Sequence, residues 1–162
     1  QGNLILEDPD MRYVAVINRY PNRNTIGLGV VKGFGLRKGT IASTVSHDCH
    51  NMIVVYDNPE NALLAVKTLC SCGGGMCAVE DRRILHTLEL PIGGLMSPLD
   101  AETLAEQCRA MKEAMRHLGL VEIDNPLLRI VTMALPVVPD LKITDLGLVD
   151  VLEKRVVPLL ID

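Results

Sequence analysis

The chain has 162 residues, of which 48% are apolar, and a net charge of −4, which suits one domain with a substantial core. Aromatic residues make up only 2% of the sequence and there is no run of Lys and Arg, so no nucleic-acid partner is expected. No apolar run reaches the roughly 18 residues of a transmembrane helix, so no membrane partner is expected either.

Residues 1–10 are interpreted as an N-terminal extension, and residues 11–162 as one domain. Gln1 and Gly2 are typical of the remnant of a cleaved purification tag, which predicts an excised fragment, although natural processing would leave the same start. No signal peptide is visible in "QGNLILEDPD", so a cytoplasmic location is expected.

Short β-forming runs dominate the first third of the chain. Residues 11–20 alternate in polarity well enough to predict a half-buried strand. Residues 26–45 contain five glycines among short β-rich runs and predict two strands joined by a glycine-rich loop at 32–38. The apolar run at 52–56 predicts another strand.

A first helix is expected to begin at Asn58 as N-cap and Pro59 as first residue, because a proline there gives up only an unused N–H donor. The three glycines at 73–75 end it. Its predicted apolar face consists of Ala62, Ala65, Val66 and Leu69. Strands at 76–79 and 84–90, separated by a hairpin turn, are expected to follow.

The second helix has the clearest pattern. Ser97 is expected to cap it, with Pro98 at its first position and Asp100 at its third, and Gly119 ends it. Apolar residues spaced three and four apart predict a face packed in the core rather than a groove for a partner. That face consists of Ala101, Leu104, Cys108, Met111, Met115 and Leu118.

Beyond this helix, a short apolar helix or strand closed by Pro136 and Pro139 is expected, followed by a tail rich in Leu and Val. The order of strands and helices, with one hairpin, predicts the α+β class. The expected architecture is a mixed, largely antiparallel sheet with two main helices packed on it.

Five cysteines form an odd set in apolar or small-residue surroundings, which favours free thiols in a reducing cytoplasm over a secreted disulfide framework. The spacing C-x-C-x4-C of Cys70, Cys72 and Cys77 matches no common zinc motif.

The stretch "VSHDCHNMIVV" concentrates His47, Asp48, Cys49, His50 and Asn51 just before a predicted strand. Imidazoles three residues apart are typical of metal ligands, but one short arc supplies few ligands, whereas catalytic sites recruit them from separate elements. A thiolate–imidazole pair of Cys49 and His50 is disfavoured, because neighbours in an extended loop point to opposite sides. The alternative is a polar turn whose side chains bond the backbone, and the spacing alone leaves both open.

Glycine-rich loops form a second set of candidates. Lys32, Gly33, Phe34 and Gly35 are loop residues whose backbone N–H groups suit a bound ligand. The segment lacks the third glycine of a dinucleotide fingerprint, and no phosphate-binding Lys-Ser/Thr pair is present. "KITDLGLVDV" places two aspartates near the end of the chain that are interpreted as turn and cap residues, Asp145 and Asp150.

Taken in order, these stretches resemble the C-terminal domain of the bacterial and archaeal adenine deaminases. The resemblance is carried by "IGLGVVKGFGLRKGTIASTVSHDCHNMIVV", "GGGMCAV", "LPIGGLMS", "ALPVVPDLKITDLGLVDV" and "VPL". It covers nearly the whole chain after Met11, and the combination of motifs is highly specific.

The resemblance implies a fragment of an amidohydrolase of purine salvage that converts adenine and water to hypoxanthine and ammonia with manganese or iron. The metal and the catalytic residues would belong to an N-terminal barrel, so no catalytic residue, metal ligand or cofactor is expected in this chain. The implied partners are that barrel, adenine and, in the parent protein, further copies of the same chain.

Within this resemblance, His47, Asp48, His50 and Asn51 are expected to line or close the mouth of the deaminase site, because their groups suit the edge of a purine. The alternatives are an interface and stability module without substrate contact, and a small stand-alone metal-binding protein. Cys49 occupies a position where a small polar residue is expected, and it is interpreted as a small buried hydrophobe.

Overall fold

The computed structural model of the chain describes residues 6–121 and 124–159. Gln1 and Gly2, with the tag interpretation placed on them, lie outside these residues. A six-stranded sheet has the order β2-β1-β4-β3-β5-β6, in which every neighbouring pair is antiparallel. Its strands are β1 (Met11–Ile17), β2 (Ile26–Lys32), β3 (Thr40–Ser43), β4 (Met52–Tyr56), β5 (Gly75–Glu80) and β6 (Arg83–Glu89).

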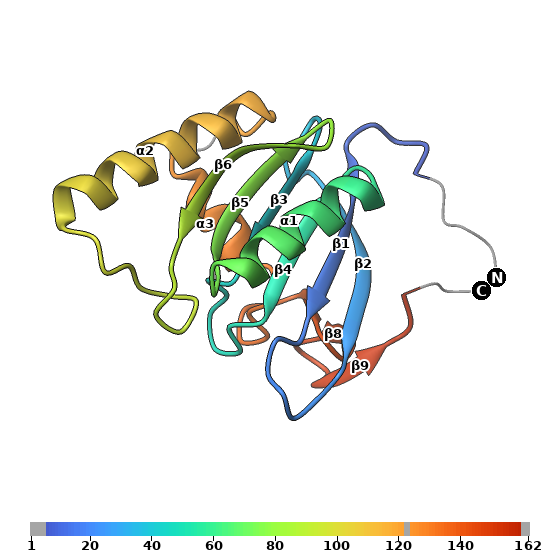
Figure 1. Ribbon diagram of the computed structural model, residues 1–162. Coiled ribbons are helices and arrows are strands. Elements are labelled where there is room, and N and C mark those ends of the chain that lie inside the picture. The colour runs from blue at the N-terminus through green and yellow to red at the C-terminus, as the bar shows by residue number, and fades with distance from the viewer. Residues whose placement is uncertain (1–5, 122–123, 160–162) are drawn as a thin grey trace.

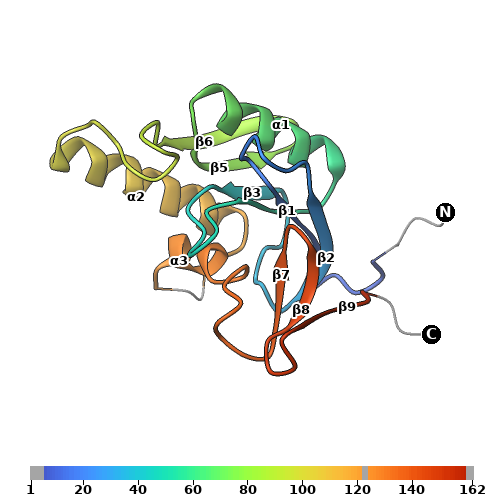
Figure 2. The ribbon, with the colours of Figure 1, turned by 90° about the horizontal axis from the view of Figure 1, so that it is seen from below.

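Helices cover the sheet on both faces (Figure 1). Helix α1 (Pro59–Ser71) lies across β3 to β6 on one face. On the other face, α2 (Ala101–His117) packs on β5 and β6, and the short α3 (Pro126–Val131) packs on β3 and β4. Figure 2 shows the sheet between α1 and α3. The α+β class and the two main helices are confirmed, but the sheet is antiparallel rather than mixed.

The core has two halves because successive residues of a strand point to opposite faces of the sheet. In β4, Ile53 and Val55 join the cluster under α2 and α3, whereas Met52 and Val54 join the cluster under α1. Strand β1 behaves in the same way, with Val16 and Ala15 buried on opposite faces. The prediction of a half-buried strand at 11–20 is therefore wrong for its centre, since helices lie on both sides of the sheet.

Local capping chemistry sets the helix ends. Asn58 caps α1 as predicted, and its side chain accepts a hydrogen bond from the Asn61 N–H. Helix α2 begins later than predicted: Asp100, not Ser97, is its N-cap, and its carboxylate accepts from two backbone N–H groups of the first turn. Ser97 accepts only from the Leu99 N–H, in the turn before the helix. The predicted core face of α2 is confirmed at Met111, Met115 and Leu118, which have no exposed surface, whereas Ala101 at the start of the helix is exposed.

A second sheet at the end of the chain was not predicted. It consists of β7 (Leu141–Thr144), β8 (Gly147–Asp150) and β9 (Arg155–Val157), all antiparallel, and it packs on β2 (Figure 2). The packing is close because β2 has glycine on that face: a Cβ at Gly27 would lie 1.8 Å from the Thr144 carbonyl oxygen. The predicted apolar segment before Pro136 forms α3, a helix.

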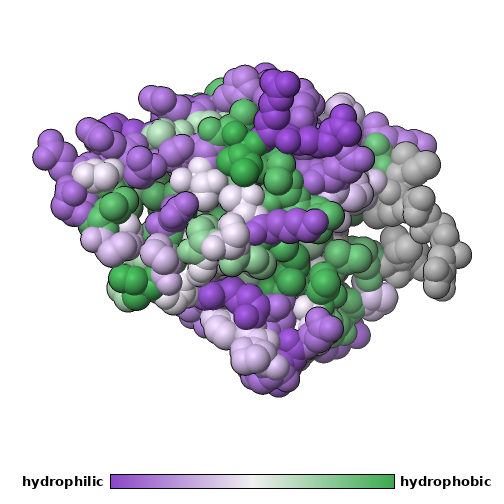
Figure 3. Space-filling view, viewed as in Figure 1, coloured by the Kyte–Doolittle hydropathy of each residue, from purple (hydrophilic) through white to green (hydrophobic). Residues whose placement is uncertain are grey.

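The opposite face of β2 is left uncovered beside α1. Ile26 and Leu28 are each 57% exposed there, and Figure 3 shows the apolar surface at this edge of the sheet. All five cysteines are free, and burial raises the pKa of the Cys77 thiol to about 11. In the described part of the chain, no helix has the length and apolar content needed to cross a bilayer.

Candidate functional site

Four connecting segments meet at one end of the six-stranded sheet. The strand register places Ile17, Ile26, Ser43 and Met52 at the same end, because Ile17 pairs with both Ile26 and Met52, and Ser43 pairs with Ile53. The connections that leave this end are 18–25, 44–51 and 90–97, and the β7–β8 turn at 145–146 joins them from the second sheet. We call this surface the loop end.

The turn at 47–50 crosses the loop end. The His50 N–H donates to the Ser46 carbonyl at 2.7 Å, and Asp48 and His50 have left-handed backbone conformations, with φ of 69° and 48°. His47 and Asp48 are exposed. The Cys49 thiol lies 3.7 Å from the Ser46 hydroxyl, which gives it a contact other than an imidazole. The turn thus offers two exposed ionisable side chains on a tightly folded backbone.

Arg19 holds this turn against the neighbouring connection. Its Nε donates to the His50 carbonyl at 2.5 Å, and one terminal nitrogen donates to the Gly93 carbonyl at 2.6 Å. A planar guanidinium can bond two acceptors at once in a fixed geometry. Its carbon also lies 5.0 Å from the centre of the Tyr20 ring. Arg19 was not singled out by the sequence analysis, since an isolated arginine at the end of a strand carries no motif.

Asp145 ties the second sheet to the same place. Its Oδ1 accepts from the Asn51 side-chain NH2 at 3.0 Å, and its Oδ2 accepts from the Thr25 hydroxyl at 2.5 Å and the Asn18 NH2 at 3.3 Å. One carboxylate therefore bonds three residues of two connections, which are 94 to 127 residues away from it in the sequence. The interpretation of Asp145 as only a turn residue is too narrow. Asp150 accepts from the Glu153 N–H and is a local turn residue, as expected.

Two buried polar atoms in this site have no hydrogen-bond partner among the described residues: His50 Nδ1 and Asn51 Oδ1. Asn51 is only 3% exposed. An unsatisfied buried donor or acceptor costs about 1–3 kcal/mol. Polar groups without partners beside a rigid hydrogen-bond network are therefore unfavourable for stability alone, and they favour a role in binding.

Glycine-rich segments support the turn from beneath. The Thr44 hydroxyl accepts from the Gly75 N–H at 2.8 Å and donates to the Gly94 carbonyl at 2.6 Å. Gly74 approaches Gly94 so closely that a Cβ on Gly74 would lie 2.6 Å from the Gly94 Cα. The glycines at 73–75 thus end a helix, as predicted, and the close approach of Gly74 to Gly94 brings two backbone segments together at the loop end.

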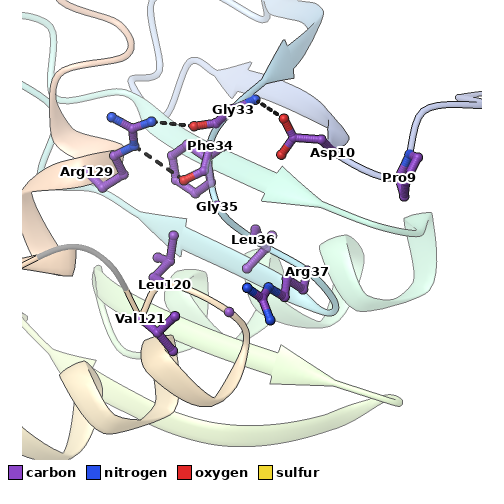
Figure 4. A pocket seen from close by; sticks show the side chains of 11 residues that line it. Pro9, Asp10, Gly33, Phe34, Gly35, Leu36, Arg37, Leu120, Val121 and Arg129 are labelled. Atoms are coloured by element: carbon purple, nitrogen blue, oxygen red, sulfur yellow. Dashed lines mark hydrogen bonds between the residues drawn. The ribbon is translucent and has the colours of Figure 1, made fainter.

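The second predicted set, Lys32 to Gly35, lies at the other end of the sheet, because Lys32 pairs with Met11. Lys32 forms a 2.7 Å ion pair with Asp8, which lowers the pKa of the Asp8 carboxyl. Arg129 donates to the carbonyls of Gly33 and Phe34 at 2.5 Å and 3.3 Å (Figure 4). The structure therefore does not bring the two predicted sets together.

Gly33, Phe34 and Gly35 line an open cavity of about 580 Å³ between their loop and the end of α2 (Figure 4). Two of its polar groups already have partners in the chain: the Gly33 N–H donates to Asp10, and Arg129 donates to the two loop carbonyls. The buried ring of Phe34 packs beside the guanidinium of Arg129, with 5.7 Å between the guanidinium carbon and the ring centre. These contacts indicate a structural loop.

The loop end also carries exposed apolar side chains. Tyr20 and Ile92 are 39% and 47% exposed, and Met96 and Leu146 are 60% and 56% exposed. They come from the same connections that Arg19 and Asp145 tie together. Among the described residues, no group of three or more His, Cys, Asp or Glu side chains is arranged to hold a metal ion. The loop end thus has the composition of a contact surface.

Comparisons with known proteins give a consistent result. A family model described as the adenine deaminase C-terminal domain matches residues 1–155. A protein named adenine deaminase from Halalkalibacterium halodurans is 46% identical over 142 residues, which is 88% of this chain and 24% of that protein. One of the same name from Moorella thermoacetica is 42% identical over 153 residues, 94% of this chain and 26% of that protein. The chain spans about a quarter of the length of these relatives.

Proposed function

The chain belongs to the adenine deaminase C-terminal domain family, and on this premise we propose that it completes or closes the active site of an adenine deaminase. The proposed reaction is the hydrolysis of adenine to hypoxanthine and ammonia. The chain matches only 24% to 26% of its relatives' length, so the proposal assigns the chemical step to the remaining part of a longer protein. The role proposed for this chain is to bind the substrate and to close the active site around it.

The observation that carries this proposal is the polar turn at 47–50, which Arg19 ties to the loop end next to Asn51. Arg19 and Asp145 fix its backbone and its neighbour Asn51 through hydrogen bonds of 2.5 Å and 3.0 Å. His47 and Asp48 remain exposed, and Asn51 has an acceptor atom without a partner in the described chain. A carboxylate can accept from the N–H donors of a purine, and imidazole and amide groups can in addition donate to its ring nitrogens.

The apolar side chains of the loop end support docking at this end of the domain. Tyr20, Ile92, Met96 and Leu146 are exposed apolar side chains on the connections of the loop end, and we call them the apolar rim. Packing of such a rim on another domain excludes water from the groups inside it, which strengthens their hydrogen bonds. In this proposal the partner is the catalytic barrel of the same protein, and the enclosed space is its active-site mouth.

The manganese or iron that the resemblance implies does not fit the described residues of this chain, since they contain no cluster of three suitable ligands. The metal would therefore be held by the barrel and not by this chain. The five free thiols support a reducing compartment such as the cytoplasm.

The test compares two aspartates in the full-length enzyme. Asp48 and Asp81 are both exposed, and both lie in tight turns with left-handed backbone, φ 69° and 47°, but at opposite ends of the sheet. Asn tolerates the left-handed conformation, so Asp48→Asn and Asp81→Asn remove a charge without adding strain. We expect Asp48→Asn to lower kcat/KM for adenine at least about tenfold, the equivalent of one lost hydrogen bond, and Asp81→Asn to leave it unchanged.

The rival function is an interface and stability module, and the apolar rim also favours that role. In this case Asp48→Asn and Asn51→Ala would lower the melting temperature of the full-length protein and leave kcat and KM for adenine at wild-type values. That result would refute the active-site role. A loss of kcat/KM at an unchanged melting temperature would refute the rival.

A further inference from the structure

The orientation of the Asn51 side chain is fixed by chemistry. A side-chain amide has a donor end and an acceptor end, whereas an ionised carboxylate only accepts. Asp145 Oδ1 lies 3.0 Å from the Asn51 amide nitrogen, so the NH2 group has to face Asp145. The other carboxylate oxygen already accepts from Thr25 and Asn18. The free end of the Asn51 amide is therefore its oxygen, the atom without a partner.

We propose that Asp145 is a positioning residue that makes Asn51 offer a hydrogen-bond acceptor, and that the group received is the exocyclic amine of a 6-aminopurine. This inference rests on the function proposed above. Adenine presents an N–H donor at this position, whereas the product hypoxanthine presents a carbonyl oxygen. An acceptor at Asn51 attracts the substrate and repels the product, so Asp145 acts through Asn51 on specificity.

The chain's own atoms cover Asn51 Oδ1, which has less than 1 Å² of accessible surface. The amine therefore reaches this oxygen only after the atoms that cover it have moved. His47 and Asp48 of that turn are exposed, and no hydrogen bond or ion pair joins their side chains to other described residues. The turn is held mainly through its backbone: the His50 carbonyl accepts from Arg19, and the His50 N–H donates to the Ser46 carbonyl.

The substitution Asp145→Asn reverses the orientation of the Asn51 amide and keeps every hydrogen bond of this network. The oxygen of the new amide accepts from Thr25 and Asn18, and its NH2 donates to position 51. The Asn51 amide then has to turn over, because its oxygen becomes the acceptor of this bond. Its free end becomes a donor, which suits hypoxanthine and not adenine.

The double substitution Asn51→Asp with Asp145→Asn is the matched control. The amide at 145 donates to the carboxylate at 51 and still accepts from Thr25 and Asn18. The second oxygen of that carboxylate is free, so position 51 offers an acceptor again. The pair keeps its total charge and its three hydrogen bonds. Only the position of the carboxylate has changed, from 145 to 51.

The experiment measures KM for adenine, Ki for hypoxanthine and the melting temperature in the full-length enzyme. We expect Asp145→Asn to raise the ratio of KM for adenine to Ki for hypoxanthine at least about tenfold. The melting temperature should stay unchanged. The double variant should restore the wild-type ratio. An unchanged ratio in Asp145→Asn overturns the proposal, and so does a lowered melting temperature that the double variant fails to restore.

A third variant separates this inference from the proposed function. If Asn51→Ala impairs adenine turnover and Asp145→Asn does not alter the ratio, the active-site role stands and the positioning role fails. If Asn51→Ala leaves kcat and KM for adenine unchanged, the active-site role itself fails.

Discussion

Removal of the Arg19 guanidinium is expected to loosen the loop end and to destabilise the chain by about 3 kcal/mol. Arg19 donates at 2.5 Å and 2.6 Å to the carbonyls of His50 and Gly93. A hydrogen bond to a charged group contributes about 1.5–3 kcal/mol, and we take the lower part of that range because the side chain is partly exposed. Two such bonds give the expected change in the free energy of unfolding for Arg19→Ala.

The assay is urea-induced unfolding of the 162-residue chain, with the m-value checked for a change in the unfolded state. Arg19→Lys is an informative second variant, since one ammonium cannot span both carbonyls and should lose about half as much stability. Arg109→Ala, on the exposed face of α2, is the control and should cost less than about 0.5 kcal/mol. A loss for Arg19→Ala no larger than that of Arg109→Ala would refute the reasoning.

Three further predictions concern stability. Asp100→Ala removes the acceptor of two N–H groups at the start of α2 and should cost about 1 kcal/mol in urea unfolding, whereas Asp100→Asn should keep most of it. Gly75→Ala places a Cβ 1.9 Å from the Leu88 carbonyl oxygen at φ 137°, so we expect a loss of about 3 kcal/mol or more; a wild-type melting temperature would contradict this. Lys38 and His117 lower the pKa of Glu80. Ionised Glu80 therefore stabilises the fold at pH values above the ordinary glutamate pKa of about 4.3. This stabilisation is lost as the pH falls through the lowered pKa. In Glu80→Gln the free energy of unfolding should therefore change less between pH 5 and pH 3, about one unit either side of the ordinary pKa. An unchanged dependence of that free energy on pH would count against the ion pairs.

Local patterns predicted the local elements well. The apolar run at 52–56 and the Asn58-Pro59 start of the first helix correspond to β4 and α1. The start of α2 was misplaced because both Ser97 and Asp100 are good caps, and only the structure shows which one meets free N–H groups. The difference is three residues, within one helical turn.

Features that depend on distant parts of the chain were not predictable. The burial of both faces of β1 depends on helices more than 40 residues away, so its alternating pattern was misleading. The second sheet consists of strands of three or four residues, too short to produce a clear alternation. The sequence identified the turn at 47–50, but Arg19 and Asp145 carry no motif, and their roles arise from the register of the sheet.

The separation of Asp145 from its partners has a consequence for biosynthesis. Ribosomes deliver the chain from its N-terminus, and Asn51 precedes Asp145 by 94 residues. A nascent polypeptide that ends before β7 can already pair β1 with β4, but its Asn51 amide is still free to rotate. Stalled chains of increasing length, probed by pulsed deuterium labelling, should acquire protection at this segment only after residue 145 has emerged from the exit tunnel.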